Sequence, residues 1–271
     1  MDKLFGLKDR VAVITGGMGQ LGVVYAAGLL ERGCKIAILD TASQPKIKNA
    51  AFEKGWATGK IINFIANICQ RDEVESALHE IERKFGIPDI LINNAALDSP
   101  PHALQSDVGP FETYPESSYD EVMAVNVKGT LICCQVVGAD MAVKGKGSII
   151  NISSIYGILS PCQDIYDFRR RNGEVFFKPV AYSVSKSAIL NLTRYLATYW
   201  ARKGVRVNTV TPAGVFDNQH DEFLEAYCAR VPMGRMADAG ELLGAIIYLA
   251  SDASSYVTGS NLVVDGGWSA W

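Results

Sequence analysis

A tyrosine and a lysine stand four residues apart, at Tyr182 and Lys186, where the sequence predicts the start of a long helix. Residues at this spacing lie on the same helical face, so the ammonium group of Lys186 would lie near the phenol of Tyr182. A phenol with a pKa of about 10 is a poor base at neutral pH, and a neighbouring positive charge lowers that pKa. The pair therefore predicts a general acid/base that moves a hydroxyl proton. Most tyrosine–lysine pairs at this spacing are ordinary surface pairs, so the prediction depends on the rest of the chain.

Two further polar residues could complete such a site. Ser154 comes just after a predicted strand, where its hydroxyl could hold a substrate oxygen while the charge on that oxygen changes. Asn126 lies in a predicted helix and could orient the lysine or a relay water. Each of these residues is ordinary by itself. Their order behind a cofactor-binding loop is what predicts a catalytic group.

A glycine-rich stretch, TGGMGQLG from Thr15 to Gly22, follows the first predicted strand and precedes a helix. Gly17, Gly19 and Gly22 match the pattern G-x-G-x-x-G in the context that this pattern requires. Glycine allows the tight turn and lets a pyrophosphate approach the backbone, where free N–H groups at the helix start bind it. A phosphate loop of the Gly-Lys-Ser/Thr kind is excluded, because the stretch lacks that tripeptide. The stretch therefore predicts a dinucleotide site.

Asp40 ends the second predicted strand, 18 residues after Gly22. An acidic side chain at that place accepts hydrogen bonds from the adenosine ribose and repels a 2′-phosphate. The glycine-rich stretch contains no Arg or Lys to bind such a phosphate. We therefore expect NAD as the cofactor, with NADP disfavoured. The alternative is an aspartate that merely ends a strand.

Strand-like runs alternate with helix-length segments along nearly the whole chain. Near-continuous apolar strands such as 12–14 and 90–92 are typical of a sheet buried on both faces. The predicted strands are 11–15, 35–40, 61–66, 89–93, 148–153, 205–210 and 261–264, and the predicted helices are 20–32, 71–85, 119–127, 129–144, 182–202 and 239–250. This alternation predicts an α/β fold: a Rossmann-type, doubly wound parallel sheet with helices on both faces, in a single domain over residues 1–271.

The bulk composition narrows the range of partners. A formal net charge of −3 gives no broad attraction to nucleic acid or to an anionic membrane. The uncharged run 11–30 contains five glycines and suits a strand, a turn and a helix better than a membrane span. Six scattered cysteines and three histidines show no metal-ligand spacing, so we expect no metal and free thiols in a reducing compartment. No leader segment is visible, and we expect a soluble, cytoplasmic protein.

At this point the chain resembles the short-chain dehydrogenase/reductase family over essentially its full length. The resemblance rests on the loop 15–22, Asn93-Asn94-Ala95, Asn126, Ser154, the Tyr182/Lys186 pair, Pro212-Ala213-Gly214 and the segment 257–267. It implies that Tyr182 is the general acid/base and that Ser154 positions the substrate oxygen. It further implies that Lys186 binds the nicotinamide ribose and tunes the tyrosine, and that Asn126 supports a proton relay. The cofactor contacts that it implies are Gly16, Gly17, Gly19, Gln20, Leu21, Gly22, Asp40, Asn67, Ile68, Asn94, Ala95, Tyr182, Lys186 and Val215.

Three residues depart from the family pattern. Gln20 stands where the middle glycine of the loop is usual, Asn67 where an aspartate is usual, and Ala96 where a glycine often follows Asn-Asn-Ala. These departures concern the detailed geometry of the cofactor site rather than the cofactor itself. The segment 257–267 resembles one that often packs between subunits in the family. A homo-oligomer, dimer or tetramer, is therefore expected.

Two irregular stretches, 97–118 and 159–180, are longer than ordinary connections. The second lies between Ser154 and Tyr182, which are 28 residues apart, more than is usual in the family. It should therefore emerge at the mouth of the site, and the two stretches together could form a lid. The arginines Arg169, Arg170 and Arg171 could bind an anionic substrate group such as phosphate, or could be a solvated charge run. Tyr156 is a further candidate for substrate contact.

Within the family, the segments 152–157, 159–180, 191–197 and 214–219 resemble oxidoreductases of bacterial flagellin-glycan and legionaminic-acid sugar biosynthesis. This resemblance implies hydride transfer between NAD and a secondary alcohol or ketone of a sugar phosphate or nucleotide-linked sugar. Two alternatives stay open. One is an enzyme like the 3-oxoacyl carrier-protein reductases, and the other is a catalytically inactive, NAD-sensing binding protein of the same fold.

Overall fold

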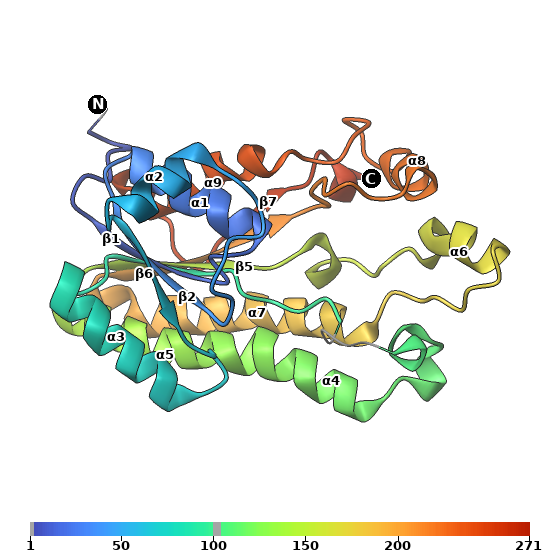
Figure 1. The fold of residues 1–271 in the computed structure, drawn as a ribbon, viewed down its shortest axis with the longest axis horizontal. Coiled ribbons are helices and arrows are strands. Elements are labelled where there is room, and N and C mark those ends of the chain that lie inside the picture. Colours follow the sequence, from blue (N-terminus) through green and yellow to red (C-terminus); the bar gives the residue numbers. More distant parts are fainter. Residues whose placement is uncertain (1–2, 100–103) are drawn as a thin grey trace.

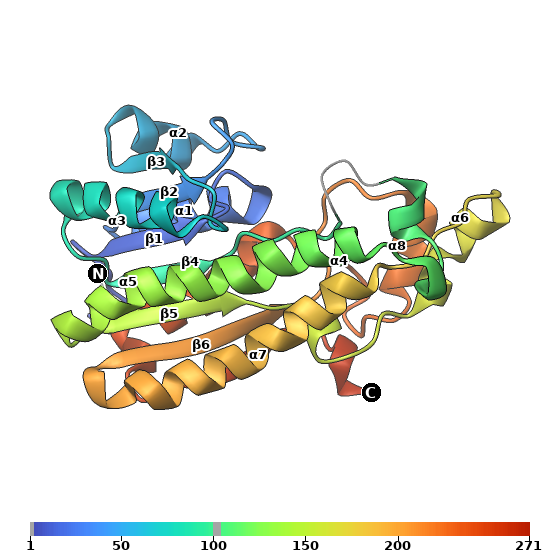
Figure 2. The ribbon, with the colours of Figure 1, turned by 90° about the horizontal axis from the view of Figure 1, so that it is seen from below.

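A sheet of seven parallel strands forms the centre of the computed structural model, which describes residues 3–99 and 104–271. The strands lie in the order β3-β2-β1-β4-β5-β6-β7, most of which can be followed in Figure 2. Their bounds are β1 (Val11–Thr15), β2 (Lys35–Asp40), β3 (Ile61–Ile65), β4 (Ile90–Asn93), β5 (Gly147–Ile152), β6 (Val205–Pro212) and β7 (Asn261–Val264). The predicted single-domain α/β fold with a doubly wound parallel sheet is confirmed.

Helices cover both faces of this sheet (Figure 1). One face carries α1 (Gln20–Glu31), α2 (Ala50–Ala57) and α9 (Leu243–Ala250), and the other carries α3 (Arg71–Phe85), α5 (Thr130–Lys144) and α7 (Val180–Trp200). Successive side chains of a strand point to opposite faces. In β1, Ala12 and Ile14 pack into the core under α1 and α9, while Val11 and Val13 pack into the core under α3, α5 and α7. Burial on both faces explains why the strands are apolar almost throughout.

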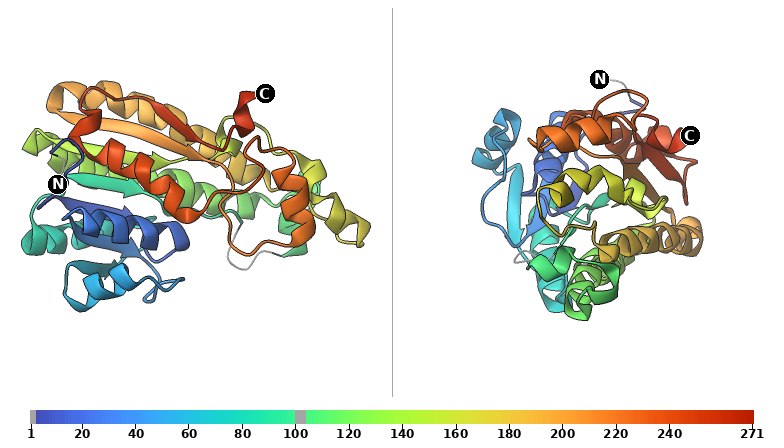
Figure 3. Two further views of the ribbon diagram at one scale, coloured as in Figure 1. Left: turned by 90° about the horizontal axis from the view of Figure 1, so that it is seen from above. Right: turned by 90° about the vertical axis from the view of Figure 1, so that its right-hand side faces the viewer.

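The strand order reverses beside β1, because β2 lies on one side of it and β4 on the other. Loops that leave the carboxyl ends of β1 and β4 separate at this point and open a crevice, where ligands of such sheets bind. The helices α4 (Glu116–Met123), α6 (Asp167–Arg171) and α8 (Asp221–Cys228) gather at this end of the molecule (Figures 1 and 3).

Predicted and observed elements agree closely in the sheet and differ in some helices. The helices predicted at 119–127 and 129–144 form one continuous run, because a π-helical segment, Ala124–Gly129, joins α4 to α5. The sequence does not predict α2, α6 and α8. These helices have eight, five and eight residues, too few for a hydrophobic period to be recognised.

The helical run Glu116–Lys144 is long and apolar enough to cross a membrane by length and composition alone. However, 56% of its most apolar window is buried inside the protein, because α5 packs against the sheet and α3. This is the environment of a core helix. The run 11–30 forms β1, the glycine turn and most of α1, as its composition predicts.

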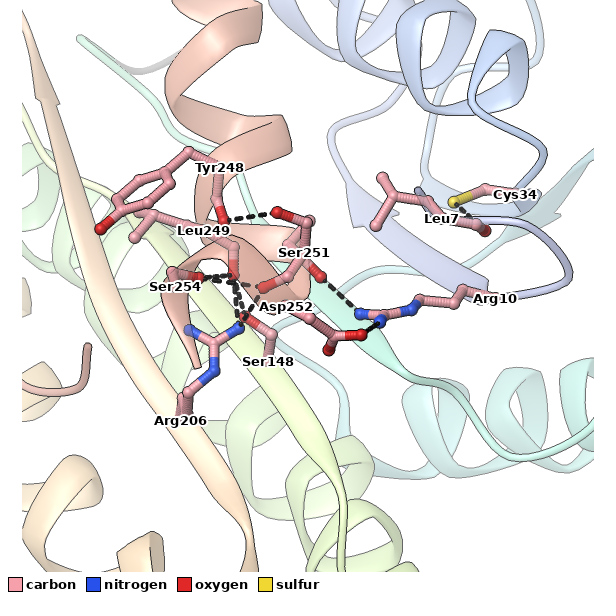
Figure 4. A network of polar contacts seen from close by, with 11 residues as sticks. Leu7, Arg10, Cys34, Ser148, Arg206, Tyr248, Leu249, Ser251, Asp252 and Ser254 are labelled. Carbon is pink, nitrogen blue, oxygen red and sulfur yellow. Dashed lines mark hydrogen bonds and ion pairs between the residues drawn. The ribbon is translucent and has the colours of Figure 1, made fainter. Parts of the chain in front are cut away.

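At the amino edge of the sheet, two arginines hold the end of α9 (Figure 4). Arg206 donates to the carbonyl oxygens of Leu249 (2.7 Å) and Ser251 (3.2 Å). Arg10 donates to the carbonyl oxygen of Ala250 at 2.9 Å. The last carbonyls of a helix lack intrahelical partners and favour positive charge, so these contacts fix α9. The polar contacts at the amino edge of the sheet therefore stabilise the fold, whereas the crevice for a ligand lies at the carboxyl edge.

Candidate active site

Two pockets meet at the carboxyl edge of the sheet. The first, of about 640 Å³, borders the loop after β1, and we call it the glycine-loop pocket. The second, of about 370 Å³, borders the start of α7, and we call it the tyrosine pocket. Leu21, Asn94 and Ala96 line both. The pockets are therefore neighbours, and one extended ligand can reach from the first into the second.

Three glycines of the loop have no room for a side chain. Gly16 has a φ of +61°, and a Cβ there would lie 2.7 Å from the Cα of Ala95. A Cβ on Gly17 would lie 2.6 Å from the Cγ2 of Ile38, and one on Gly22 would lie 2.4 Å from the carbonyl oxygen of Gly16. Gly17 and Gly22 thus allow the turn to form but do not line the pocket, although the sequence pattern suggested that they contact the cofactor directly.

The start of α1 is open toward the glycine-loop pocket. Gly19 stands at the N-cap and no side chain caps the helix, while Gly19, Gln20 and Leu21 line the pocket. Backbone N–H groups in a first helical turn lack intrahelical partners and favour an anion. Gln20 departs from the family pattern, and its amide donates to the carbonyl oxygen of Phe216 at 2.8 Å, which ties the loop to the segment after β6.

Asp40 lines the glycine-loop pocket with a fixed carboxylate. Its two oxygens accept from the backbone N–H groups of Met18 and Ala42, each at 2.9 Å. Lys46 is the one cationic side chain among the described residues that line this pocket, and its Nζ lies 2.6 Å from Oδ2 of Asp217. The charge that a 2′-phosphate would meet first is therefore negative.

The remaining predicted cofactor residues divide between the two pockets. Asn67, Ile68, Asn94 and Ala95 line the glycine-loop pocket, and Val215 lines the tyrosine pocket. The Asn94 amide donates to the carbonyl oxygens of Thr15 (3.1 Å) and Gly16 (3.0 Å), so it holds the glycine turn from the β4 side. Three features of this pocket fit a dinucleotide. The glycine turn has no room for Cβ atoms, the start of α1 is uncapped, and the Asp40 carboxylate lines the pocket where it can accept from a ribose hydroxyl. The nicotinamide end of the dinucleotide would lie toward Lys186 and Val215.

Lys186 is held inside the tyrosine pocket. The helix α7 starts after Pro179 and places Tyr182 and Lys186 on its pocket side. The Nζ of Lys186 donates to the carbonyl oxygen of Ile152 at 2.8 Å and lies 5.7 Å from the centre of the Tyr182 ring. Burial lowers the pKa of Lys186 to about 8, and the Asp98 carboxylate opposes that shift.

Tyr182 lines the same pocket together with Ser154 and Tyr156. Burial raises the pKa of Tyr182, and Asp98 raises it as well, whereas Lys178 and a hydrogen bond with Ser154 lower it. The Ser154 oxygen also accepts from the backbone N–H of Tyr156 at 3.2 Å, which orients the hydroxyl. The structure thus brings Ser154, Tyr182 and Lys186 to one place suited to proton transfer at a substrate oxygen.

Asn126 connects the start of α7 with the loop after β4. It belongs to the π-helical segment, where a widened turn often marks a functional position. Its side chain accepts from the backbone N–H of Leu97 (2.7 Å) and donates to the Leu97 carbonyl (2.8 Å) and the Ser185 hydroxyl (2.9 Å). Asn126 therefore fixes the backbone beside Asp98 and contacts the residue before Lys186, and its role in a proton relay stays a prediction.

The three arginines of the stretch 159–180 do not line the tyrosine pocket. Arg169 pairs with Glu174 at 2.7 Å and stacks on Phe176, and Arg171 is exposed. Arg170 pairs with Asp167. Of the two alternatives for these arginines, an anion site or a solvated charge run, the anion site at this pocket is wrong. Contacts within their own segment satisfy Arg169 and Arg170, and the third arginine points to solvent.

Besides Lys186, the charged side chains that line the tyrosine pocket in the described part of the chain are Lys178 and Asp98. Neither was expected from the sequence, where the run of arginines was the stronger charge signal. Lys178 stands four residues before Tyr182, just ahead of the helix. That closeness to Tyr182, the predicted general acid/base, was the available signal. Asp98 lies in the stretch 97–118, whose residues 100–103 are outside the described part of the chain.

The comparisons with known proteins agree with this geometry. The profile of the enoyl-(acyl carrier protein) reductase family matches residues 19–269. The D-arabinitol 2-dehydrogenase (ribulose-forming) of Scheffersomyces stipitis is 34% identical, over 98% of this chain and 96% of that protein. This relative is named for a neutral polyol. It gives no support to the narrower likeness to flagellin-glycan and legionaminic-acid enzymes.

Two solved structures are similar over nearly the whole chain. A short-chain dehydrogenase from Leptospira borgpetersenii with bound NAD⁺ has a TM-score of 0.83 and 33% identity, and the match covers 97% of this chain and 94% of that one. A gluconate 5-dehydrogenase from Burkholderia cenocepacia, in complex with NADP and tartrate, has a TM-score of 0.82 and 28% identity, with 99% and 98% covered. By this geometry and these likenesses, the chain belongs to the short-chain dehydrogenase/reductase family, NAD(P)-dependent oxidoreductases that act on CH–OH groups.

Proposed function

We propose that this protein interconverts a secondary hydroxyl of a small, neutral polyol and the corresponding ketone, with NAD as the cofactor. The observation that carries the proposal is the tyrosine pocket. Its volume of about 370 Å³ is at the low end of ordinary ligand sites, and it must also take the nicotinamide end of the cofactor. What is left suits a short acyclic sugar alcohol such as the one named for the Scheffersomyces stipitis relative.

The residues of this pocket divide the chemistry among themselves. In the direction of oxidation, Tyr182 as phenolate takes the hydroxyl proton, and Ser154 holds the substrate oxygen by a hydrogen bond. Lys186 stabilises the phenolate with its charge, and its contact with Ile152 keeps the ammonium group in place. Bound NAD would supply the acceptor for the hydride that leaves the same carbon.

NAD is the proposed cofactor because of the charges around Asp40. A 2′-phosphate would meet the carboxylate of Asp40, and the nearest cation, Lys46, is paired with Asp217. The similar structures hold NAD⁺ in one case and NADP in another, so the family fold is compatible with both. The choice therefore depends on this chain's own side chains.

Larger or more acidic substrates have less support. A nucleotide-linked sugar or a carrier-protein thioester would need more room than the tyrosine pocket offers, and a phosphate would meet Lys178 already paired with Asp98. A catalytically inactive sensor has no need for Tyr182 and Lys186 in one pocket. A polyhydroxy acid is the second candidate, because a gluconate 5-dehydrogenase is among the similar structures.

The proposal includes a homo-oligomer in a reducing cytoplasm. Leu131, Val143, Tyr195 and Tyr199 are exposed on α5 and α7, and they border a groove of about 670 Å³. An apolar face of this kind favours a second copy of the chain. All six cysteines are free thiols, which fits a reducing compartment. Light scattering of the purified chain measures the oligomeric state.

The test of the proposed function is NADH formation over a panel of polyols, D-gluconate, sugar phosphates and nucleotide sugars. We expect turnover of polyols, and we expect Tyr182→Phe to lower kcat by roughly 10²- to 10⁴-fold while calorimetry shows unchanged NAD binding. Tyr256→Phe, an exposed tyrosine outside both pockets and outside the groove on α5 and α7, is the matched control. Turnover unaffected by Tyr182→Phe on every substrate would contradict the proposal, and so would a protein that binds no NAD.

A further inference from the structure

Asp98 and Lys178 join the two irregular stretches across the tyrosine pocket. The Nζ of Lys178 lies 2.5 Å from one carboxylate oxygen of Asp98 and 2.6 Å from the other. The two residues are 80 positions apart in the chain, and both line the pocket. The Lys178 side chain is 13% exposed and that of Asp98 is 55% exposed. The ammonium group thus lies inside, and the carboxylate covers it from the solvent side.

This ion pair borders the reacting groups directly. The Nζ of Lys178 lies 5.2 Å from the centre of the Tyr182 ring and 5.9 Å from that of Tyr156. The hydroxyl of Tyr156 is buried, interacts with the hydroxyl of Tyr166 and makes no close hydrogen bond in the described part of the chain. A buried hydroxyl without a close partner costs free energy, which a hydrogen bond to a ligand would offset. Two donors, Lys178 and Tyr156, and one acceptor, Asp98, therefore lie beside the reacting groups. The part of the substrate beyond its reacting carbon would meet them there.

The backbone on the lysine side of the pair is fixed from several directions. Gln163 accepts from the backbone N–H of Lys178 (2.8 Å) and donates to its carbonyl (3.3 Å). Phe177, one residue earlier, donates to the carbonyl of Val108 at 2.7 Å. Arg170 donates to the carbonyls of Gln163 (2.7 Å) and Phe176 (2.9 Å). Arg170 thus braces the segment that presents Lys178.

The aspartate side is fixed as well, because Asn126 holds both backbone groups of Leu97, the residue before Asp98. Groups held in advance lose little conformational freedom when a ligand binds, and so they discriminate well between ligands. The pair is therefore built to act on a substrate, beyond being an ordinary surface ion pair.

We propose that the Asp98–Lys178 pair selects the substrate: Asp98 accepts from one hydroxyl of a neutral polyol, Lys178 and Tyr156 donate to others, and Asp98 excludes carboxylates. This inference rests on the proposed function and names the residues that decide its substrate class. A carboxylate at this place would lie against the charge of Asp98, and Lys178 is already neutralised, so it offers no net attraction. A neutral polyol meets no such repulsion and can satisfy every group.

The test compares kcat/KM for D-arabinitol and for D-gluconate in the wild-type chain, Asp98→Asn and Lys178→Met. We expect the wild type to prefer the polyol. Asp98→Asn frees the ammonium group, so the polyol-to-gluconate ratio should fall by about tenfold, mostly through KM. Lys178→Met should lower kcat/KM for the polyol by about tenfold without improving gluconate. Asp164→Asn, an exposed carboxylate of the stretch 159–180, and Lys84→Met on α3 are the matched controls.

A binding measurement separates this inference from the proposed function. The same two compounds are titrated into each variant in the presence of NADH, with calorimetry as the readout. Turnover with an unchanged ratio in Asp98→Asn overturns the selection by the pair and leaves the function standing. Binding that follows the expected order without turnover overturns the function and supports the pair. A wild-type preference for gluconate overturns the inference, and neither binding nor turnover of either compound overturns both.

Discussion

The glycine-loop pocket and the outer wall of the tyrosine pocket are built in opposite ways. Eight consecutive residues, 15–22, make the phosphate turn, and Asp40 stands at the end of the next strand. In this pocket the predicted contacts to the phosphates come from backbone N–H groups, and the glycines leave room for the phosphates to approach. The outer wall instead joins Asp98 and Lys178 from two irregular stretches far apart in the chain. The cofactor pocket is thus formed mainly by residues that are close in the sequence, whereas the proposed substrate contacts depend on the packing of distant segments.

This difference also decides how each region tolerates change. At Gly16 and Gly22 the nearest neighbours are backbone atoms, which cannot move aside. In the outer wall the side chains can be replaced without a clash, since Asp98 is half exposed. Substitutions in the turn should therefore abolish binding, while substitutions in the wall should alter which ligand is preferred.

The largest effect on cofactor binding is expected for Gly22→Ala. Its Cβ would lie 2.4 Å from the Gly16 carbonyl oxygen and 2.5 Å from the Gly17 Cα. We expect NAD affinity, measured by calorimetry, to fall by about 100-fold, as strain of about 1–3 kcal/mol in a packed site allows. Gly244→Ala on α9 is the control, because a Cβ there meets nothing within 4 Å and the residue lines neither pocket. Equal losses in the two variants would show that the turn is not limited by these contacts.

Asp40→Asn should have a smaller effect, and a selective one. It removes the charge that faces a 2′-phosphate and keeps the size of the side chain. The NAD-to-NADP ratio of kcat/KM should fall by about tenfold. Adding Lys46→Met should take back part of the gain in NADP use, because Lys46 lines the same pocket. An unchanged ratio in Asp40→Asn would place the cofactor choice in other residues.

The smallest change concerns the pH profile of polyol oxidation, which needs Tyr182 deprotonated and therefore rises with pH through the Tyr182 pKa. Asp98 raises this pKa and Lys178 lowers it. Lys178→Met should therefore move the acidic limb of kcat/KM to higher pH, and Asp98→Asn should move it to lower pH. Asp98 also raises the pKa of Lys186, which burial lowers to about 8, so Asp98→Asn should move the alkaline limb downward too. Shifts in the same direction for both variants would rule out this electrostatic role.

The sequence by itself determined the fold class, the strands to within one or two residues, the glycine turn, Asp40 and the Ser154–Tyr182–Lys186 group. These depend on short periods and fixed spacings: apolar runs for buried strands, glycines where a Cβ has no room, and a four-residue step along a helix. The short helices α2, α6 and α8 escaped prediction because their packing, rather than their own period, stabilises them.

Only the tertiary structure decided what the charged and polar residues of the irregular stretches do. Arg169–Arg171 were the conspicuous charges, yet Arg170 braces a backbone segment and the pocket takes Lys178 instead. Asn126 contacts Ser185, the residue before Lys186, and it also holds the backbone of Leu97, which the sequence did not predict. The physical reason is that a long polar side chain takes its nearest satisfying partner, and which partner is nearest is set by how distant segments pack against one another.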